Sequence, residues 1–323
     1  MKYIVALLVL VVVSTSFLSD ENSTMFKFMK FVKEHNKEYE TFEEFHERFE
    51  IFKNNLNKVE NHEVFSPFMD MTEYEFNARL TLDADAIAAA KSKMESYVLK
   101  NRLSSSELPE SFNWNDQGAV MPVKNQGSCG SCWAFSAVGN LEGLLFKKTK
   151  TLKGLSEQQL VDCDKKDQGC NGGFMDDAFD YVNKAGGIMS EDDYSYKGRG
   201  GKCNFDKSKV ALTISGFLDV SKNEDEIAQV LLENGPLSVA VNATPFQFYF
   251  GGVFAPKKCN PEGLNHGVLL VGFGEEKKGG EVQKYWIIKN SWGTKWGEKG
   301  YIRLQRGTGM CGVNTNVSTA TIN

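Results

Sequence analysis

The residues best suited to chemistry in this sequence are a cysteine and a histidine that lie far apart along the chain. The 323 residues include seven cysteines and four histidines. All seven cysteines follow Ser128, and His266 is the only histidine in that part of the chain. A nucleophilic cysteine is commonly activated by an adjacent imidazole base. If one of these cysteines is a nucleophile, His266 is therefore its base.

Cys132 is the strongest candidate for that nucleophile because it begins a helix-like pattern. It follows Gly130-Ser131 and starts the apolar run from Trp133 to Val138. The free N–H groups and the positive dipole end of a helix N-terminus stabilise a thiolate over a thiol. An odd number of cysteines in a secreted chain also leaves at least one thiol unpaired. An inert buried thiol is the alternative interpretation of the odd cysteine.

Cys129 and Cys132 also form a C-x-x-C pair, which is a feature of dithiol redox sites and of zinc sites. The chain has no second C-x-x-C and no H-x₃-H that would complete a metal site. The region also lacks the βαβ context of thioredoxin-like motifs. We therefore expect no metal and no cofactor.

Two apolar runs provide a partner for His266. The run HGVLLVGFG begins at His266, YWIIKN ends at Asn290, and a polar, turn-rich stretch separates them. Folded as an antiparallel hairpin about residue 278, the runs place residues 266 and 290 opposite each other, with Cβ atoms roughly 5 Å apart. The asparagine amide could then fix the ring and tautomer of the imidazole. A turn-forming asparagine is the alternative.

These residues predict acyl transfer by a thiol. Cys132 would attack an acyl carbon, His266 would act as base and then as acid, and Asn290 would orient the imidazole. The reaction forms a thioester that water hydrolyses, and it needs donors for the developing oxyanion. The backbone N–H of Cys132 is one candidate donor and the Gln126 side chain is another. Without further information, Gln126 would be interpreted as a surface residue.

The elements that must position these residues fall into two segments. From Thr41 to Glu63, six apolar residues recur at spacings of three and four, which predicts an amphipathic helix, and a second helix pattern begins near Thr24. Residues 81–107 are interpreted as a weakly structured connector, with a boundary at Leu108-Pro109. Beyond it we expect helices and then strands. The helices are expected at 133–148, 156–161 and 176–184, and the strands at 212–217, 237–241, 268–273, 285–289 and 301–306.

Charge and hydropathy separate the same two segments. The formal net charge of −5 lies entirely within residues 1–107, whereas residues 108–323 are balanced. No basic patch suggests nucleic acid. Residues 1–16 have the pattern of a secretory signal peptide, because the apolar run from Ile4 to Val13 is short for a membrane anchor, which is the alternative. Such a chain enters an oxidising compartment, where disulfides persist.

At this point the motifs resemble a known family. The segments GSCGSCWAFS, His266-Gly267 and NSWGTKWGEKGY, which begins at Asn290, are similar to the papain family of cysteine proteases, and to its cathepsin L-like endopeptidases. The resemblance implies an α+β, two-lobed papain-like fold. It assigns residues 108–323 to the peptidase domain, with a helical lobe at about 115–213 and a β-barrel-like lobe at about 214–320.

The resemblance also assigns site residues. It makes Gln126 the side-chain oxyanion donor, makes Trp292 a shield for the His–Asn pair, and leaves Cys132 free. It implies the disulfides Cys129–Cys170, Cys163–Cys203 and Cys259–Cys311. It implies a substrate cleft with an apolar S2 pocket, so that P2 residues should be Leu, Val or Phe and P2 Arg should be used weakly. The residues implied to contact substrate are Gly130, Gly172, Gly173, Phe174, Met175, Ala240, Leu264, Gly267, Trp292 and, at the base of S2, Asn316.

Residues 17–107 resemble the inhibitory propeptide of the family. The propeptide helix pattern falls on Glu44, Arg48, Phe52, Asn55 and Val59, with Glu63 in place of the final Asn. A second motif keeps Phe68 and Asp70 but has Val64 and Ser66 where Gly and Asn are usual. The acidic surplus of this segment predicts that its carboxylates become partly protonated near pH 4–5 and release the cleft.

The expected protein is thus a secreted or lysosomal endopeptidase made as an inactive zymogen. Its partners would be protein and peptide substrates, its own propeptide and cystatin-type inhibitors, with no nucleic acid, no membrane, and a monomeric state. Two other functions share these features: a catalytically silent binding protein with the same fold, and an acyl transferase or transpeptidase. The first usually lacks the nucleophile or the base, and an aminolysis assay would identify the second.

Overall fold

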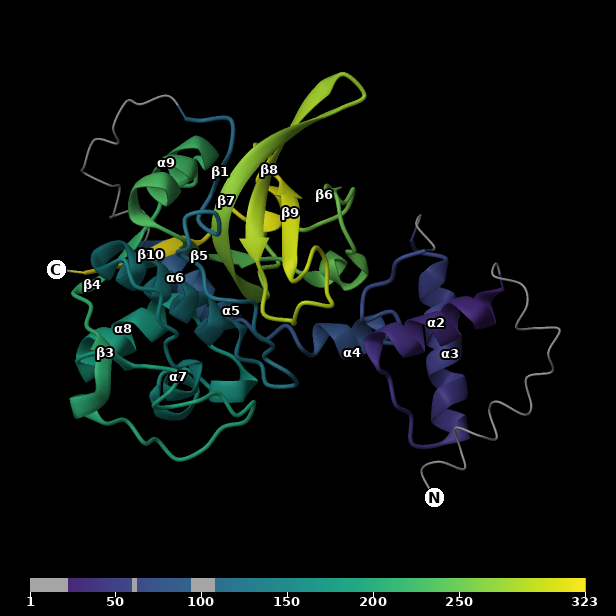
Figure 1. Cartoon of the computed structure of the whole chain (residues 1–323), viewed down its shortest axis with the longest axis horizontal. Coiled ribbons are helices and arrows are strands. Elements are labelled where there is room, and N and C mark those ends of the chain that lie inside the picture. Colours follow the sequence, from purple (N-terminus) through teal and green to yellow (C-terminus); the bar gives the residue numbers. More distant parts are fainter. Residues whose placement is uncertain (1–22, 60–62, 94–107, 323) are drawn as a thin grey trace. The chain divides into compact units, whose positions relative to one another are not determined.

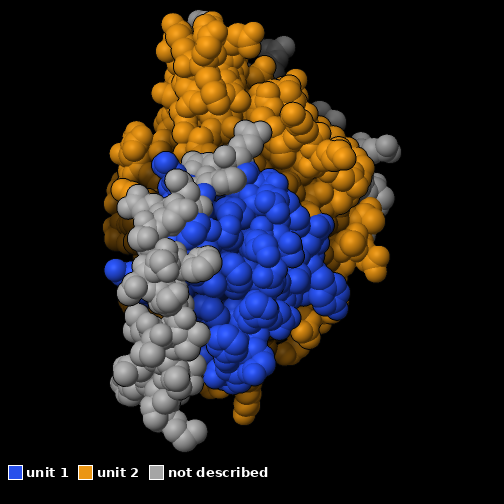
Figure 2. All heavy atoms as spheres, turned by 90° about the vertical axis from the view of Figure 1, so that its right-hand side faces the viewer, with its two compact units in different colours: residues 1–78, 246–250 blue, residues 79–245, 251–323 orange. Residues whose placement is uncertain are grey.

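The computed structural model describes residues 23–59, 63–93 and 108–322 (Figure 1). The expected signal peptide, 1–16, and the part of the expected connector at 94–107 lie outside the described residues. The chain divides into two compact units, which Figure 2 colours separately: residues 1–78 with 246–250, and residues 79–245 with 251–323. No helix in the described ranges is long and apolar enough to cross a membrane.

The first unit contains the helices α2 (Thr24–His35), α3 (Phe42–Leu56) and α4 (Glu73–Asn77). The apolar faces of α2 and α3 meet in a cluster of aromatic rings, whose buried members are Phe28, Phe31, Phe52 and Phe65. The predicted helix over 41–63 is too long, because α3 ends at Leu56. The apolar spacing continues past that end because Val59 still packs against the same cluster after the chain has left the helix.

Polar side chains hold residues 66–75 against α3. The Asn55 amide donates to the carbonyls of Met69 (3.0 Å) and Met71 (2.8 Å). Arg48 binds the Glu75 carboxylate at 2.8 Å. The two unusual motif residues differ in their surroundings: Ser66 is buried and accepts from the Phe68 N–H at 3.3 Å, whereas Val64 is exposed. The altered motif therefore still forms an ordered turn beside α3.

The second unit begins with helices close to the predicted ones. They are α6 (Cys132–Thr149), α7 (Glu157–Cys163) and α8 (Met175–Ala185). Most of α6 is buried, as expected for a helix that is apolar on nearly all sides. The connector prediction is wrong for residues 84–93, which form α5 (Ala84–Lys93). Ile87 of α5 is buried in the main hydrophobic core, and this burial stabilises the helix.

An eight-stranded sheet forms the rest of this unit, in the order β4-β10-β5-β7-β8-β9-β6, with β1 added to β7. A separate two-stranded sheet pairs β2 with β3. The strand bounds are β1 Phe112–Asn113, β2 Ile188–Met189, β3 Val210–Leu212, β4 Gly216–Asp219, β5 Leu237–Val241, β6 Val253–Phe254, β7 His266–Lys278, β8 Glu281–Lys289, β9 Tyr301–Gln305 and β10 Val317–Thr321.

Two parts of the β half differ from the prediction. The strand expected at 212–217 is split between β3 and β4, which belong to different sheets. The helix α9 (Glu224–Asn234) was not predicted; it begins after the cap Asn223, whose side chain accepts from Asp225 N and Glu226 N. In Figure 1, α9 lies beside β1 and β7, and its Ile227 and Leu231 are buried.

β7 and β8 form the predicted antiparallel hairpin, but their residues pair in a different register from the one predicted. Its turn consists of Gly279 and Gly280, both with positive φ, so that Lys278 pairs with Glu281. An irregularity between Leu270 and Gly272 then shifts the pairing by one residue. The prediction placed the turn too early, because any polar residue of the connecting stretch could have formed it, whereas a two-residue turn with two positive φ angles favours glycine. His266 is consequently not the cross-strand partner of Asn290.

Candidate active site

Cys132 is the first residue of α6, where the thiol meets the helix N-terminus. It is the only free cysteine among the described residues, and its exposed fraction is 0%. The other six cysteines form Cys129–Cys170, Cys163–Cys203 and Cys259–Cys311, which are the pairs that the resemblance implies. Cys129–Cys170 closes the chain three residues before Cys132, and the Gly130 N–H donates to the Cys170 carbonyl at 2.8 Å. The start of α6 is thus fixed by a covalent link.

His266 and Asn290 lie side by side although the hairpin register differs from the prediction. His266 begins β7 and Asn290 follows the last residue of β8, and His266 Nε2 lies 2.8 Å from Asn290 Oδ1. The Ser291 N–H donates to the same Oδ1 at 2.8 Å, which identifies that atom as the oxygen. His266 Nε2 therefore carries the proton, and Nδ1 is left as a base with no hydrogen-bond partner in the described part of the chain.

Trp292 contacts the His266 ring, and Gln126 is hydrogen-bonded to Ser291, the residue after Asn290. The Trp292 ring stacks on the His266 ring with centroids 4.6 Å apart. Gln126 is buried rather than at the surface; its Oε1 accepts from Ser291 Oγ at 2.7 Å, and its Nε2 donates to the Cys129 carbonyl at 3.0 Å. The Ser291 hydroxyl thus fixes which way the Gln126 amide faces. Sequence reasoning missed Ser291, although its position beside Asn290 and its hydroxyl were available signals.

A glycine lets the strand of the base approach the helix of the thiol. A Cβ at Gly267 would lie 3.0 Å from Met175 Sδ and 3.2 Å from the Cys132 carbonyl oxygen. Both distances are shorter than most real Cβ contacts. Gly267 therefore allows β7 to pass directly over the first turn of α6.

Residues 79–83 occupy the region over the candidate nucleophile, and this segment was not recognised in the sequence. The Thr81 hydroxyl donates to the Gly130 carbonyl at 3.0 Å, and a Cβ at Gly130 would lie 2.3 Å from Thr81 Oγ1. Leu82 forms a parallel bridge with Gly173. The Leu82 N–H donates to the Asn265 carbonyl and the Asp83 N–H donates to the Gly173 carbonyl, each at 3.1 Å. An extended strand thus already lies along the glycine-rich segment.

The residues implied for S2 form part of one apolar cluster. Phe174, Met175, Ala240 and Leu264 are buried in the same apolar cluster as Leu82, a residue of the segment over Cys132. Gly172 and Gly173 approach the prosegment and the Trp133 ring closely: a Cβ would lie 2.2 Å from the Thr81 carbonyl oxygen at Gly172 and 2.6 Å from the Trp133 ring at Gly173. Asn316 is fully buried, its main-chain carbonyl accepts from Ala240 N, and neither amide atom has a hydrogen-bond partner among the described residues.

Burial favours the uncharged form of both candidate catalytic groups. Burial raises the pKa of the Cys132 thiol, although hydrogen bonds from Gly267, Trp133 and Thr81 oppose the shift. Burial lowers the pKa of His266 to about 4, opposed by the Asn290 hydrogen bond and reinforced by the charge of Arg79. Arg79 itself donates to the Gly127 carbonyl at 2.7 Å. The thiolate–imidazolium pair is therefore disfavoured in this form.

Within the described ranges, no group of three or more His, Cys, Asp or Glu side chains could hold a metal ion. The C-x-x-C pair is divided between a disulfide, at Cys129, and a free thiol, at Cys132.

Comparisons with known families agree with this arrangement. The model of the papain family of cysteine proteases matches residues 108–321. The model of the cathepsin propeptide inhibitor domain matches residues 28–77. The two matches together cover most of both segments recognised in the sequence.

Individual relatives and solved structures give the same result. Cysteine proteinase 15A of Pisum sativum is 45% identical over 319 residues, which cover 90% of this chain and 85% of that protein. Cysteine proteinase 1 of Dictyostelium discoideum is 41% identical over 345 residues, with 98% and 99% coverage. The structure of digestive procathepsin L 3 from the Tenebrio molitor larval midgut matches with a TM-score of 0.79 and 38% identity, and covers 93% of this chain and 99% of that chain.

A papain-like fold of helices and sheet, preceded by a propeptide inhibitor domain, defines the zymogen of a thiol-dependent hydrolase. The chain belongs to the papain family of cysteine proteases, and it resembles the procathepsin L-like members of that family.

Proposed function

We propose that the mature enzyme is an endopeptidase that works through Cys132, His266 and Asn290. In the open cleft, His266 Nδ1 takes the thiol proton, and the Cys132 sulfur attacks the carbonyl carbon of the substrate. The protonated imidazole then gives its proton to the leaving amine, and a thioester remains that water hydrolyses with His266 as base. Asn290 Oδ1 holds the Nε2–H throughout. The observation that carries the proposal is the 2.8 Å His266–Asn290 bond, which leaves Nδ1 free to act as the base.

Gln126 is proposed to stabilise the oxyanion together with the Cys132 N–H. Its Nε2 has one hydrogen on the Cys129 carbonyl and a second hydrogen for a ligand, and Ser291 keeps the amide in that orientation. The removal of one such donor costs on the order of 10²–10³ in kcat in other proteases.

The proposed substrates are proteins and peptides with an apolar P2 residue. Leu82 supports this preference because it lies in the same buried apolar cluster as Phe174, Met175 and Leu264. The neutral Asn316 at the base predicts weak use of P2 Arg. Cleavage of P2-Arg and P2-Leu peptides at equal kcat/KM would contradict the pocket assignment.

The proposed life cycle is that of a secretory zymogen. The domain limits that we propose are a signal peptide at 1–16, a propeptide at 17–107 and a peptidase domain from about Leu108, with lobes at about 115–213 and 214–320. The mature enzyme would work as a monomer in a lysosome-like acidic compartment or outside the cell. Cystatin-type proteins are proposed as inhibitors.

The decisive experiment compares the wild-type proform with Cys132→Ser after a shift to acid pH. We expect the wild type to process itself, to be titrated by an epoxide thiol inhibitor and to cleave the P2-Leu peptide. The variant should lose all three properties while still folding. Peptide cleavage by Cys132→Ser would rule out the proposed nucleophile.

A further inference from the structure

Tyr196 is not one of the candidate catalytic residues, but it is hydrogen-bonded to the segments that would form the oxyanion pocket. The Tyr196 hydroxyl donates to the main-chain carbonyl of Gln126 at 2.9 Å. The same hydroxyl lies 2.7 Å from Ser131 Oγ. The single Tyr196 hydroxyl hydrogen points at Gln126, so Ser131 must be the donor in the second bond. The other acceptor open to Ser131, the Cys129 carbonyl, is more distant at 3.5 Å.

These two bonds join the two segments that would form the pocket. Gln126 carries the candidate side-chain donor, and Ser131 is bonded directly to Cys132, whose N–H is the candidate main-chain donor. Between them the chain runs through Gly127 and Gly130, which adopt loop conformations and add little stiffness of their own. The tyrosine hydroxyl therefore links the two ends of this loop, in addition to the Cys129–Cys170 disulfide within it.

The ring and the loop that carry this hydroxyl are themselves held in place. The Tyr196 ring packs edge-on against the Phe135 ring, with centroids 4.8 Å apart. The main-chain N–H of Tyr196 donates to Glu191 Oε1 at 3.0 Å. Burial raises the pKa of Tyr196, so the hydroxyl keeps its proton. The orientation of the bridge is thus set by contacts on several sides.

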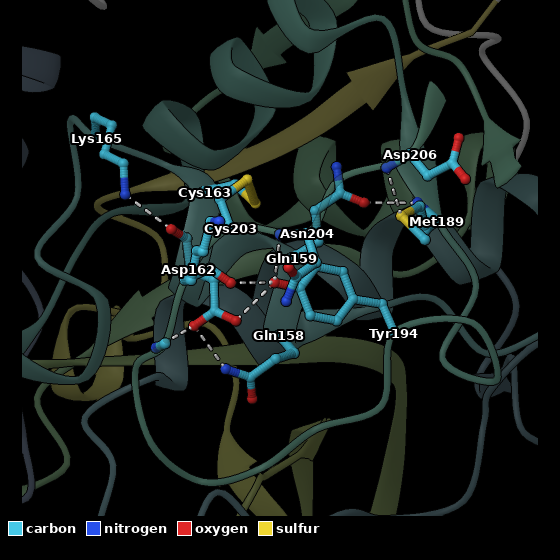
Figure 3. Close-up of a disulfide and its surroundings, with 12 residues drawn as sticks. Gln158, Gln159, Asp162, Cys163, Lys165, Met189, Tyr194, Cys203, Asn204 and Asp206 are labelled. Atoms are coloured by element: carbon cyan, nitrogen blue, oxygen red, sulfur yellow. Dashed lines mark hydrogen bonds between the residues drawn. A yellow bond between two sulfur atoms is a disulfide. The ribbon is translucent and has the colours of Figure 1, made fainter. Parts of the chain in front are cut away.

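Figure 3 shows the disulfide Cys163–Cys203 and the contacts around it, which hold the loop that carries Tyr196. The disulfide Cys163–Cys203 ties the loop to the end of α7. The buried Asp162 carboxylate accepts from the Tyr194 hydroxyl at 2.7 Å and from the Gly201 N–H at 2.6 Å. Tyr196 lies between these two donors in the sequence, so the network fixes the loop on both sides of it.

We propose that Tyr196 is a positioning residue for catalysis, because it holds the main chain of Gln126 so that the Gln126 amide is aligned with the developing oxyanion. Ser131 supports the tyrosine by donating to it. The inference rests on the proposed function, since it assumes that Gln126 stabilises the oxyanion. Tyr196 acts through Gln126 and contacts no reacting atom.

The test uses Tyr196→Phe in the activated enzyme, since phenylalanine keeps the ring on Phe135 and removes only the hydroxyl. We expect kcat to fall by about 5- to 10-fold, the effect of one lost hydrogen bond, with KM within about twofold. A peptide aldehyde, whose adduct carries the oxyanion, should bind more weakly by a similar factor. The matched control is Tyr301→Phe, which removes a 2.8 Å hydroxyl bond to Asn115 Oδ1 elsewhere and should leave kcat within about twofold.

A double-mutant cycle separates positioning from general loosening. In a Gln126→Ala background, Tyr196→Phe should lower kcat by less than about twofold, because the residue through which it acts is gone. A full and multiplicative effect in that background would overturn the inference, as would a Tyr196→Phe enzyme indistinguishable from the Tyr301→Phe control. Normal kcat in Gln126→Ala alone would instead refute the proposed oxyanion role, and the inference with it. If Tyr196→Phe does not fold, Ser131→Ala tests the same network from the other end and should lower kcat in the same direction.

Discussion

Gly267 determines how closely the candidate base can approach the candidate nucleophile. The sequence identified Cys132 and His266 by type, because there was one histidine to choose after Ser128. It could not supply their separation, which depends on the absence of a side chain at position 267. A Cβ there would press on Met175 and on the Cys132 carbonyl. The approach of the two candidate residues thus depends on a residue with no chemistry of its own.

The first prediction concerns Gly267→Ala in the activated enzyme. The added methyl group should push β7 away from α6 and lower kcat/KM by roughly 10- to 100-fold, because small displacements of reacting groups are costly. The rate at which iodoacetamide alkylates Cys132 should fall as well, since His266 would no longer stabilise the thiolate. Gly200→Ala is the control, because a Cβ at Gly200 meets nothing within 4 Å. Equal kcat/KM values in the two variants would show that a side chain at position 267 can be accommodated without moving β7 away from α6.

At the scale of elements, the sequence predicted the long periodic segments well and the tertiary details poorly. The ends of α6 and α8 lie within one residue of the prediction, because their apolar periodicity is uninterrupted. The helix α5 was missed because its alanine-rich sequence has little amphipathic pattern, and its fold depends on the burial of Ile87. The register of β7 and β8 was missed because it depends on a glycine turn and a local irregularity. Thr81 and Leu82 carried no local signal, since their partners lie far along the chain.

The loop between α7 and α8 contains a pair of acidic side chains that gives a second prediction. Asp167 accepts from the Phe174 N–H at 2.9 Å beside the glycine segment. Burial, and then the charge of Asp164, raise the pKa of Asp167 well above its usual range. A carboxyl whose pKa is higher in the folded state adds stability at low pH, and this contribution is lost as the pH rises through the folded value. The loop should therefore be most stable in acid.

Asp167→Asn should remove this pH dependence, because the amide can both accept from Phe174 and donate to Asp164 as the protonated acid does. In thiol-blocked mature enzyme, the variant and the wild type should melt at similar temperatures at pH 4. At pH 8 the variant should melt higher by roughly 5 °C. The exposed Asp192→Asn is the control and should follow the wild type. A variant that melts lower than the wild type at pH 8 would contradict a raised pKa.

At the scale of the whole zymogen, one ion pair of the prosegment departs from the expected route of acid activation. Acid was expected to release the prosegment by protonating its carboxylates near pH 4–5. Glu75, however, is held by Arg48 and has a pKa of about 2, so this ion pair persists in that range. A carboxylate whose pKa is lowered in the folded state loses its stabilising effect only as the pH falls toward that lowered pKa. The Arg48–Glu75 pair therefore does not respond at pH 4–5.

The lowered pKa of His266 gives this residue a response in that range. Its pKa is about 4 while residues 79–83 cover the cleft, and it should return toward about 6.5 once the cleft opens. The closed form therefore binds fewer protons, and its stability is lost as the pH falls from about 6.5 to 4. At pH 4.5 the open form should gain a factor on the order of 100 over pH 7.5. The zymogen would thus open through the protonation of its own base.

Hydrogen exchange in the Cys132→Ser proform tests this route without self-processing. The Leu82 and Asp83 amides are bonded to Asn265 and Gly173 only while the cleft is covered, so their protection factors report its opening. We expect both factors to fall steeply between pH 6.5 and 4.5. In a Cys132→Ser/His266→Gln proform the fall should largely disappear, because glutamine does not titrate. Glu75→Gln, as the control, should keep the pH profile of the parent. A profile that is unchanged by His266→Gln would assign the response to other groups of the zymogen.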